Sequence, residues 1–235
     1  MLRRARSLAL ARHATRTNAT AATLYIDGKP CSADDGATVD TRSPVDDSVQ
    51  AFLSDASAAD AARAVGAAAR VRDTGKWGSD GAARRDALRH AAAELRLDLD
   101  DYAATEAADC GKVLAEATGD VGYCADVLDY YAGLVEDAPR RDALAPPPDG
   151  YFDVPLAARA VAYPRGVAAL ITPWNFPLMQ AVLKMAPAVA AGCPFVLKPS
   201  PLASMTCVRF VRDALGPACP PGAANVLTGG PPASP

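Results

Sequence analysis

Two short segments of this sequence combine prolines with side chains that could do chemistry. One carries Asn175 and the other begins with Lys198; in full they are Thr172-Pro173-Trp174-Asn175-Phe176-Pro177 and Lys198-Pro199-Ser200-Pro201. Proline fixes one backbone angle and removes a hydrogen-bond donor, so both segments are expected to be stiff. Pro177 also suits the first turn of a following helix. We therefore expect Asn175 to be held on a rigid turn at a helix N-terminus.

Asn175 has two interpretations. Its side-chain amide could donate a hydrogen bond to an oxyanion that develops during a reaction, which is worth about 3 kcal/mol in a transition state. It could instead simply cap the helix that follows. The residue pattern alone favours the cap.

Two lysines accompany these segments. Lys198 ends an apolar run and could contact a ribose or a phosphate, or could be an ordinary solvated lysine. Lys184 lies between the two segments, among Val182, Met185 and Val189. It is either a surface lysine or a buried, paired one, and the pattern favours the surface.

The surrounding sequence alternates between strand-like and helix-like segments. Strands are predicted at Val167–Ile171, Pro194–Lys198 and Asn225–Thr228, and helices at Leu178–Ala191 and Ala203–Leu215. The order βαβαβ predicts an α/β fold with a partial Rossmann-type parallel sheet and right-handed crossovers. Ligands of such sheets bind beyond the carboxyl ends of the strands. The two proline-containing segments, 172–177 and 198–201, lie at these ends. The G-x-G-x-x-G dinucleotide fingerprint is absent after the first strand.

The N-terminal half predicts a hairpin followed by helices. A hairpin is expected within Leu24–Thr41, because Asp27-Gly28 is a strong turn signal, and a short strand at Val49–Leu53. Apolar spacing predicts helices at 58–72, 82–109 (one helix or a pair) and 113–135. A proline-rich linker is expected at 139–150 and an extended arm at 151–164.

Composition excludes several classes of protein. The net charge of −3 is dispersed, so there is no nucleic-acid footprint, and no apolar run is long enough to span a membrane. The six cysteines form no C-x-x-C pair, and two histidines are too few for a histidine-based metal centre or triad.

The first 22 residues are rich in arginine and hydroxyl side chains and contain no acidic residue. This composition is typical of an organelle transit peptide. A mitochondrial location is favoured, with a plastid or the cytoplasm as alternatives.

The run from Ile171 to Ser200 resembles the aldehyde dehydrogenase superfamily through PWNFP, KMAPAVAAG and VLKPS. Ala108–Lys112 and Leu128–Ala132 are similar to the betaine-aldehyde and aminoaldehyde branch. The resemblance covers about Leu24 to Gly230. It implies an aldehyde-dehydrogenase-like N-terminal region with four parts: a transit peptide (1–22), the hairpin and helical part of the cofactor-binding domain (23–137), a linker and arm (138–165), and a partial βαβαβ half (166–235).

The resemblance also implies roles for particular residues. Asn175 matches the oxyanion-hole asparagine, and Lys184 matches a lysine of a proton relay. Lys198 matches the lysine that contacts the adenosine ribose. Four residues match the wall along the nicotinamide side: Ile171, Pro173, Trp174 and Asn175. The rest of the cofactor-binding stretch comprises Thr172, Pro199, Ser200 and Pro201. Asp109, with the carbonyls of Thr41 and Arg42, matches a potassium site.

The implied reaction is covalent. A cysteine thiolate attacks the aldehyde, hydride passes to NAD or NADP, and a glutamate-activated water releases the acid. The matching cysteine, glutamate and catalytic domain are expected beyond Pro235, so the chain alone is expected to be inactive. The expected partners are a small aldehyde and, in the full-length form, a homo-oligomer.

Two residues depart from the branch. Pro201 replaces a glutamate that grips the ribose, which leaves NADP open. Leu183 replaces a tryptophan, which favours a general ω-aminoaldehyde or aliphatic aldehyde over betaine aldehyde. The alternative hypothesis is a non-catalytic module that pairs with a full-length homologue.

Overall fold

The structure is a computed structural model that describes residues 23–137 and 163–230. The expected transit peptide, the proline-rich linker and nearly all of the extended arm lie outside the described residues.

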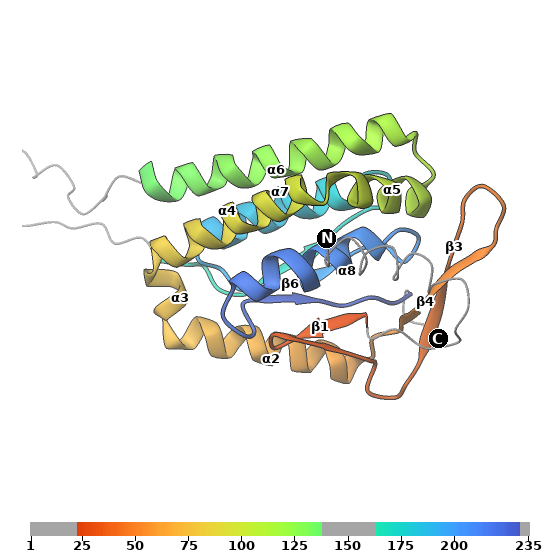
Figure 1. The fold of residues 1–235 in the computed structure, drawn as a ribbon. Helices are drawn as coiled ribbons and strands as arrows, with labels where there is room; N and C mark the ends of the chain where they lie inside the picture. Colours follow the sequence, from red (N-terminus) through yellow and green to blue (C-terminus); the bar gives the residue numbers. More distant parts are fainter. Residues whose placement is uncertain (1–22, 138–162, 231–235) are drawn as a thin grey trace, which may run out of the picture.

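The described chain begins with four short strands, continues with five helices and ends in an alternation of strands and helices (Figure 1). The first part comprises β1 Leu24–Ile26, β2 Lys29–Cys31, β3 Thr38–Arg42, β4 Val49–Ser54, α2 Ala58–Thr74, α3 Lys76–Ser79, α4 Gly81–Leu97, α5 Leu99–Cys110 and α6 Leu114–Asp137. The second part comprises β5 Ala168–Ile171, α7 Pro177–Ala190, β6 Phe195–Lys198, α8 Met205–Phe210, the π-helix η1 Val211–Leu215, the 3-10 helix η2 Gly216–Ala218 and β7 Ala224–Val226.

The main sheet is mixed, with the order β2-β1-β7-β6-β5. Strands β5, β6 and β7 are parallel to one another, which confirms the predicted βαβαβ unit. The antiparallel hairpin β1–β2 extends this sheet through the pairing of Tyr25 with Val226, so the sheet is not parallel throughout. Strands β3 and β4 form a separate antiparallel pair.

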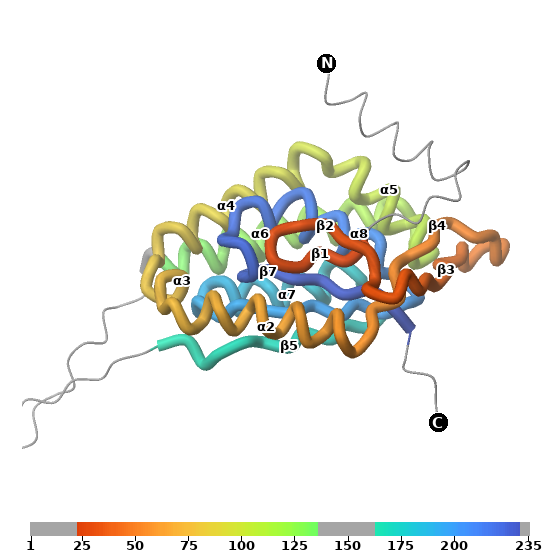
Figure 2. The backbone as a smooth tube through the Cα atoms, turned by 90° about the horizontal axis from the view of Figure 1, so that it is seen from below, coloured from red at the N-terminus to blue at the C-terminus, as the bar shows by residue number. Residues whose placement is uncertain are grey.

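Both faces of the main sheet are covered. Helices α4, α6, α7 and α8 lie on one side of it and α2 on the other (Figures 1 and 2). Alternate residues of β6 divide between the two layers: Phe195 and Leu197 join the large core under α4, α6 and α7, whereas Val196 packs with Leu24 and the alanines of α2. This division follows from the two-residue period of side chains along a strand.

The predicted hairpin turn is confirmed at Asp27-Gly28. Ile26 pairs with Lys29 across a two-residue loop in which both turn residues have positive φ, 55° for Asp27 and 78° for Gly28. Such a turn matches the twist of the strands it joins.

The helical predictions hold with two refinements. The segment 82–109 is a pair of helices that meet at Asp98, and Asp98 is the C-cap of α4 and the N-cap of α5. The predicted helix Ala203–Leu215 begins at Met205 and widens into the π-helix η1, where the N–H of Gly216 donates to the carbonyl of Val211. Pro217 follows at once and has no N–H with which to continue an α-helical ladder. Within the described ranges, none of the helices is both long and apolar enough to cross a bilayer.

Candidate functional site

The two predicted chemical segments begin at the same edge of the sheet. Ile171, the last residue of β5, pairs with Lys198, the last residue of β6. The N–H of Thr172 continues the ladder by donating to the carbonyl of Lys198 at 3.3 Å. The loop after β5 and the segment after β6 therefore leave the sheet side by side, at the carboxyl ends of parallel strands.

The loop Thr172–Phe176, here called the Asn175 loop, is exposed. Ile171 and Trp174 expose 70% and 53% of their surface, although both are large and apolar. Thr172 is buried, and its hydroxyl has no hydrogen-bond partner among the described residues. The exposed apolar side chains of Ile171 and Trp174 suit a surface that a ligand covers.

Asn175 does not cap α7, so the interpretation that the pattern favoured is wrong. The N-cap position belongs to Phe176, with no side-chain capping bond, and Pro177 occupies the first turn. The Asn175 side chain has no hydrogen-bond partner among the described residues, and the residue is exposed. Its amide is therefore available to a ligand.

Glu106, on α5, supplies the cap that Asn175 does not. Its Oε1 accepts a hydrogen bond of 3.1 Å from the backbone N–H of Leu178, in the first turn of α7. Asp109 lies one turn further along α5 and caps α8. Its carboxylate accepts a hydrogen bond of 2.8 Å from the backbone N–H of Met205. One helix thus holds the N-termini of both crossover helices with two buried carboxylates, which compensate the partial positive charge there.

Sequence reasoning missed Glu106. A signal was present, because Glu106 and Asp109 continue the spacing of the apolar stripe through Leu95, Leu99 and Tyr102. Acidic residues at core positions of a helix need a buried partner, and the backbone N–H groups of other helices are such partners.

Burial perturbs both carboxylates. It raises the pKa of Glu106, an effect opposed by hydrogen bonding and by the charge of Lys112. It raises the pKa of Asp109 to about 7, where the hydrogen bond from Met205 lowers the value and the charge of Glu106 raises it. The cost of ionising either group in the core explains the direction.

Thr41 and Asp109, from the predicted potassium site, lie together. The Thr41 hydroxyl donates to Asp109 Oδ1 at 3.3 Å, and both residues are buried. The β3–β4 register shifts between Thr41 and Arg42: Thr41 pairs with Ala51 and Arg42 with Val49, so Gln50 of β4 has no partner in the ladder. The Arg42 side chain points elsewhere, to Asp40 at 2.6 Å and Asp47 at 3.4 Å.

This donor set fits a hard cation that prefers oxygen. Among the described residues the Asp109 carboxylate accepts hydrogen bonds from Thr41 and Met205 and has no ion-pair partner, so it can supply an oxygen ligand to such a cation. The described residues contain no cluster of three or more histidine, cysteine or acidic side chains, so nothing in them resembles a transition-metal site.

Lys198 is half-buried, so it is not simply a solvated lysine. Its Nζ donates to the carbonyls of Gly229 at 2.6 Å and Pro199 at 3.2 Å. Burial lowers its pKa, and the charge of Asp55 opposes this effect. Gly229 has φ of 138°, and a Cβ there would lie 2.5 Å from an Asp55 carboxylate oxygen. Lys198 thus joins the end of β6 to the segment after β7.

The remaining predicted residues divide into two groups. Pro199 is buried, while Ser200 and Pro201 are half-buried at the same edge. Lys184 is exposed on α7, as the pattern favoured, and no hydrogen bond joins it to Asn175 among the described residues.

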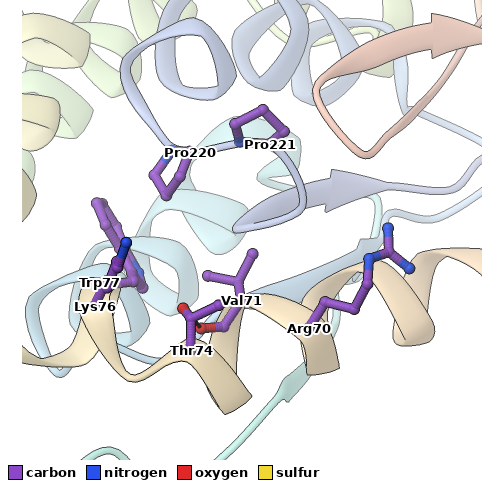
Figure 3. A pocket seen from close by; sticks show the side chains of 7 residues that line it. All are labelled: Arg70, Val71, Thr74, Lys76, Trp77, Pro220 and Pro221. Atoms are coloured by element: carbon purple, nitrogen blue, oxygen red, sulfur yellow. Dashed lines mark hydrogen bonds between the residues drawn. The ribbon is translucent and has the colours of Figure 1, made fainter.

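A hollow of about 280 Å³ lies elsewhere, between α2, α3 and Pro220-Pro221 (Figure 3). Pro221 precedes β7, so this hollow lies toward the amino ends of the strands, opposite the edge described above. None of the predicted site residues lines it.

Three parallel strands in a sheet covered on both faces, with polar groups gathered at their carboxyl ends, define an α/β protein of the doubly wound, Rossmann-type class. Residues 31–234 match the model of the aldehyde dehydrogenase family. The chain belongs to this family, as the resemblance implied.

Similar proteins come from the branch that the sequence suggested. The chain is 43% identical over 180 residues to the chloroplastic betaine aldehyde dehydrogenase of Amaranthus hypochondriacus, covering 74% of this chain and 35% of that protein. It is 36% identical to the betaine aldehyde dehydrogenase of Bacillus subtilis, covering 88% of this chain and 41% of that protein. A crystal structure of Staphylococcus aureus betaine aldehyde dehydrogenase in complex with NAD+ matches with a TM-score of 0.81 and 30% identity, covering 97% of this chain and 43% of that one. The chain thus spans less than half the length of each of these proteins.

Proposed function

We propose that the described region is the cofactor-binding and oxyanion-stabilising part of an aldehyde dehydrogenase. The proposed reaction is oxidation of an aminoaldehyde or betaine aldehyde to its acid with NAD or NADP. The observation that carries the proposal is the free, exposed amide of Asn175 on a stiff loop that leaves the sheet beside Lys198. The betaine aldehyde dehydrogenases among the similar proteins support the substrate class.

In this proposal each group has a distinct task. The nicotinamide cofactor, when bound, takes up hydride from the substrate. Lys198 and Ser200 would face its ribose, while Ile171 and Trp174 would cover its apolar surface. The Asn175 amide would donate to the substrate oxygen as negative charge develops on it. Pro201 offers no carboxylate to a ribose, so both NAD and NADP belong to the proposal.

The first test is cofactor binding by the protein itself. Titration calorimetry with NAD+ and with NADP+ is expected to give saturable binding to at least one of them. The Ile171→Asp variant places a carboxylate on the exposed wall and should weaken that binding. Absence of binding for both cofactors would contradict the proposal.

The second test addresses Asn175. The assay of aldehyde oxidation uses a form of the protein that includes the catalytic domain. There Asn175→Asp keeps the size of the side chain but removes the amide donor, so kcat should fall by about 10²–10³. Betaine aldehyde, an ω-aminoaldehyde and an aliphatic aldehyde form the substrate panel. Cofactor binding without oxidation of any aldehyde would favour the alternative, a non-catalytic module.

Two further proposals concern assembly and location. A homo-oligomer is supported by the exposed aromatic side chains Tyr123 and Tyr130 on α6, and light scattering tests it.

An organelle address in residues 1–22 remains a proposal. Similar plant proteins carry the word chloroplastic or peroxisomal in their names. This supports a plastid location for the present protein more than a mitochondrial one. A fluorescent protein fused behind these residues would show the compartment.

A further inference from the structure

The Asn175 loop is exposed, yet its last residue, Phe176, and the first two residues of α7 contact side chains from three other parts of the chain. The ring of Phe176 lies under the ammonium of Lys112, with Nζ 4.3 Å from the ring centroid. The Cys207 thiol donates to the carbonyl of Pro177 at 3.3 Å, and Glu106 accepts from Leu178. The loop is therefore attached at its α7 end, directly after Asn175.

Lys112 is itself held in place. Its ammonium pairs with Asp120 of α6 at 2.5 Å, and only 9% of its side chain is exposed. Lys112 is also near enough to Glu106 for its charge to oppose the rise that burial causes in the pKa of that carboxyl. Lys112 lies between α5 and α6 in the chain, so the contact with Phe176 joins this junction to the N-terminus of α7.

This arrangement favours a positioning role over a direct one. A lysine so fully covered and already paired with Asp120 presents little of its charge to a ligand. Cation–π contacts strengthen when the cation is shielded from water, as Lys112 is. Phe176 is adjacent to Asn175, so fixing the direction of the ring restricts the backbone from which the amide projects.

We propose that Lys112 is a positioning residue that, through the ring of Phe176, holds the Asn175 loop in one conformation. Its importance for oxyanion stabilisation rests on the proposed function of Asn175, whereas its effect on the loop does not. The experiment therefore reads the loop directly, without aldehyde chemistry.

Trp174 makes this possible, because the chain has only two tryptophans. The other, Trp77, is buried, and its indole N–H has no hydrogen-bond partner among the described residues, so Trp77→Phe breaks no hydrogen bond. In this background all tryptophan fluorescence comes from the Asn175 loop. Its quenching by acrylamide and its anisotropy report how firmly the loop is held.

Lys112→Met keeps the length of the side chain but removes the charge. We expect the quenching constant of Trp174 to rise about twofold and the anisotropy to fall. Lys112→Arg keeps a cation above the ring and should restore both values. The matched control is Lys29→Met, an exposed lysine on β2, which should leave both values unchanged. Circular dichroism confirms folding of each variant.

A second variant keeps the proposal testable if Lys112→Met does not fold. Phe176→Leu removes the ring from a partly exposed position. If the pair acts as one unit, Phe176→Leu and the double variant with Lys112→Met should give the same values. Unchanged quenching in folded Lys112→Met, or independent additive effects of the two substitutions, would overturn the proposal. A loosened loop together with full activity of Asn175→Asp would instead leave it standing and refute the proposed role of Asn175.

Discussion

The Oε1 of Glu106 lies 3.1 Å from the backbone nitrogen of Leu178, so a fully buried carboxylate of α5 caps the N-terminus of α7. The two residues are 72 positions apart in the chain. This bond, with the parallel one from Met205 to Asp109, ties the helical part of the chain to the βαβαβ unit. The position of the Asn175 loop therefore depends on two acidic residues of α5, which lie outside the loop.

Replacing Glu106 with alanine should destabilise the protein. The Leu178 N–H would lose its acceptor in the core, which costs about 1–3 kcal/mol. Urea unfolding followed by circular dichroism measures this loss. The exposed Glu116, in the first turn of α6, provides the control: Glu116→Ala should change the free energy of unfolding by less than about 0.5 kcal/mol. Equal effects at the two positions would argue against a buried cap.

Glu106 should also make stability depend on pH. Burial raises its pKa above the ordinary 4.5, so the folded state binds the proton more tightly than the unfolded state does. The free energy of unfolding contributed by this group is thus greatest below pH 4.5 and falls as the pH rises through the raised pKa. Glu106→Gln cannot ionise and keeps an acceptor for Leu178.

The measurement is a series of unfolding curves between about pH 4 and pH 8. Glu106→Gln should gain stability relative to the unsubstituted protein as the pH rises, and Glu116→Gln should not. A difference that shrinks with rising pH would mean that the folded state prefers the charged carboxylate, contrary to this account.

Lys198→Met should weaken cofactor binding. The substitution removes the ammonium that joins β6 to Gly229 and faces the proposed ribose site. A charge-assisted hydrogen bond is worth about 1.5–3 kcal/mol, so Kd for the preferred cofactor should rise at least about tenfold in calorimetry. Lys29→Met is again the control, because that lysine is exposed on β2. An unchanged Kd would mean that Lys198 only joins β6 to Gly229 and does not bind the cofactor.

Potassium should stabilise the protein through Asp109. If Asp109 and the carbonyls of Thr41 and Arg42 bind a cation in the folded state, the thermal midpoint should be higher in potassium chloride than in tetramethylammonium chloride. Asp109→Asn should abolish this difference, whereas Asp100→Asn, at an exposed position of the same helix, should keep it. A midpoint that is equal in both salts would contradict a potassium site here.

Much of the fold could be predicted because its signals are local. The Asp27-Gly28 turn and the alternation from Val167 to Thr228 depend on backbone preferences of neighbouring residues. The register that brings Ile171 beside Lys198 follows from two such strands running in parallel. The PWNFP and VLKPS motifs were sufficient to indicate the family, which the family match confirms.

Other features depended on residues far apart in the chain. Local pattern favoured Asn175 as a helix cap, but Glu106 takes up a free N–H of that helix and leaves the amide available. The extension of the sheet by the hairpin requires Tyr25 to meet Val226, and the attachment of the loop requires Lys112 to meet Phe176.

The sequence by itself thus determined the βαβαβ unit, the longer helices, the family and the residues that end β5 and β6, because these depend on short-range geometry and recognisable motifs. Only the tertiary structure decided which polar groups remain free and which are already satisfied. A hydrogen bond or ion pair in the core is made by whichever partner packing brings within about 3 Å, and neither spacing nor composition encodes that partner.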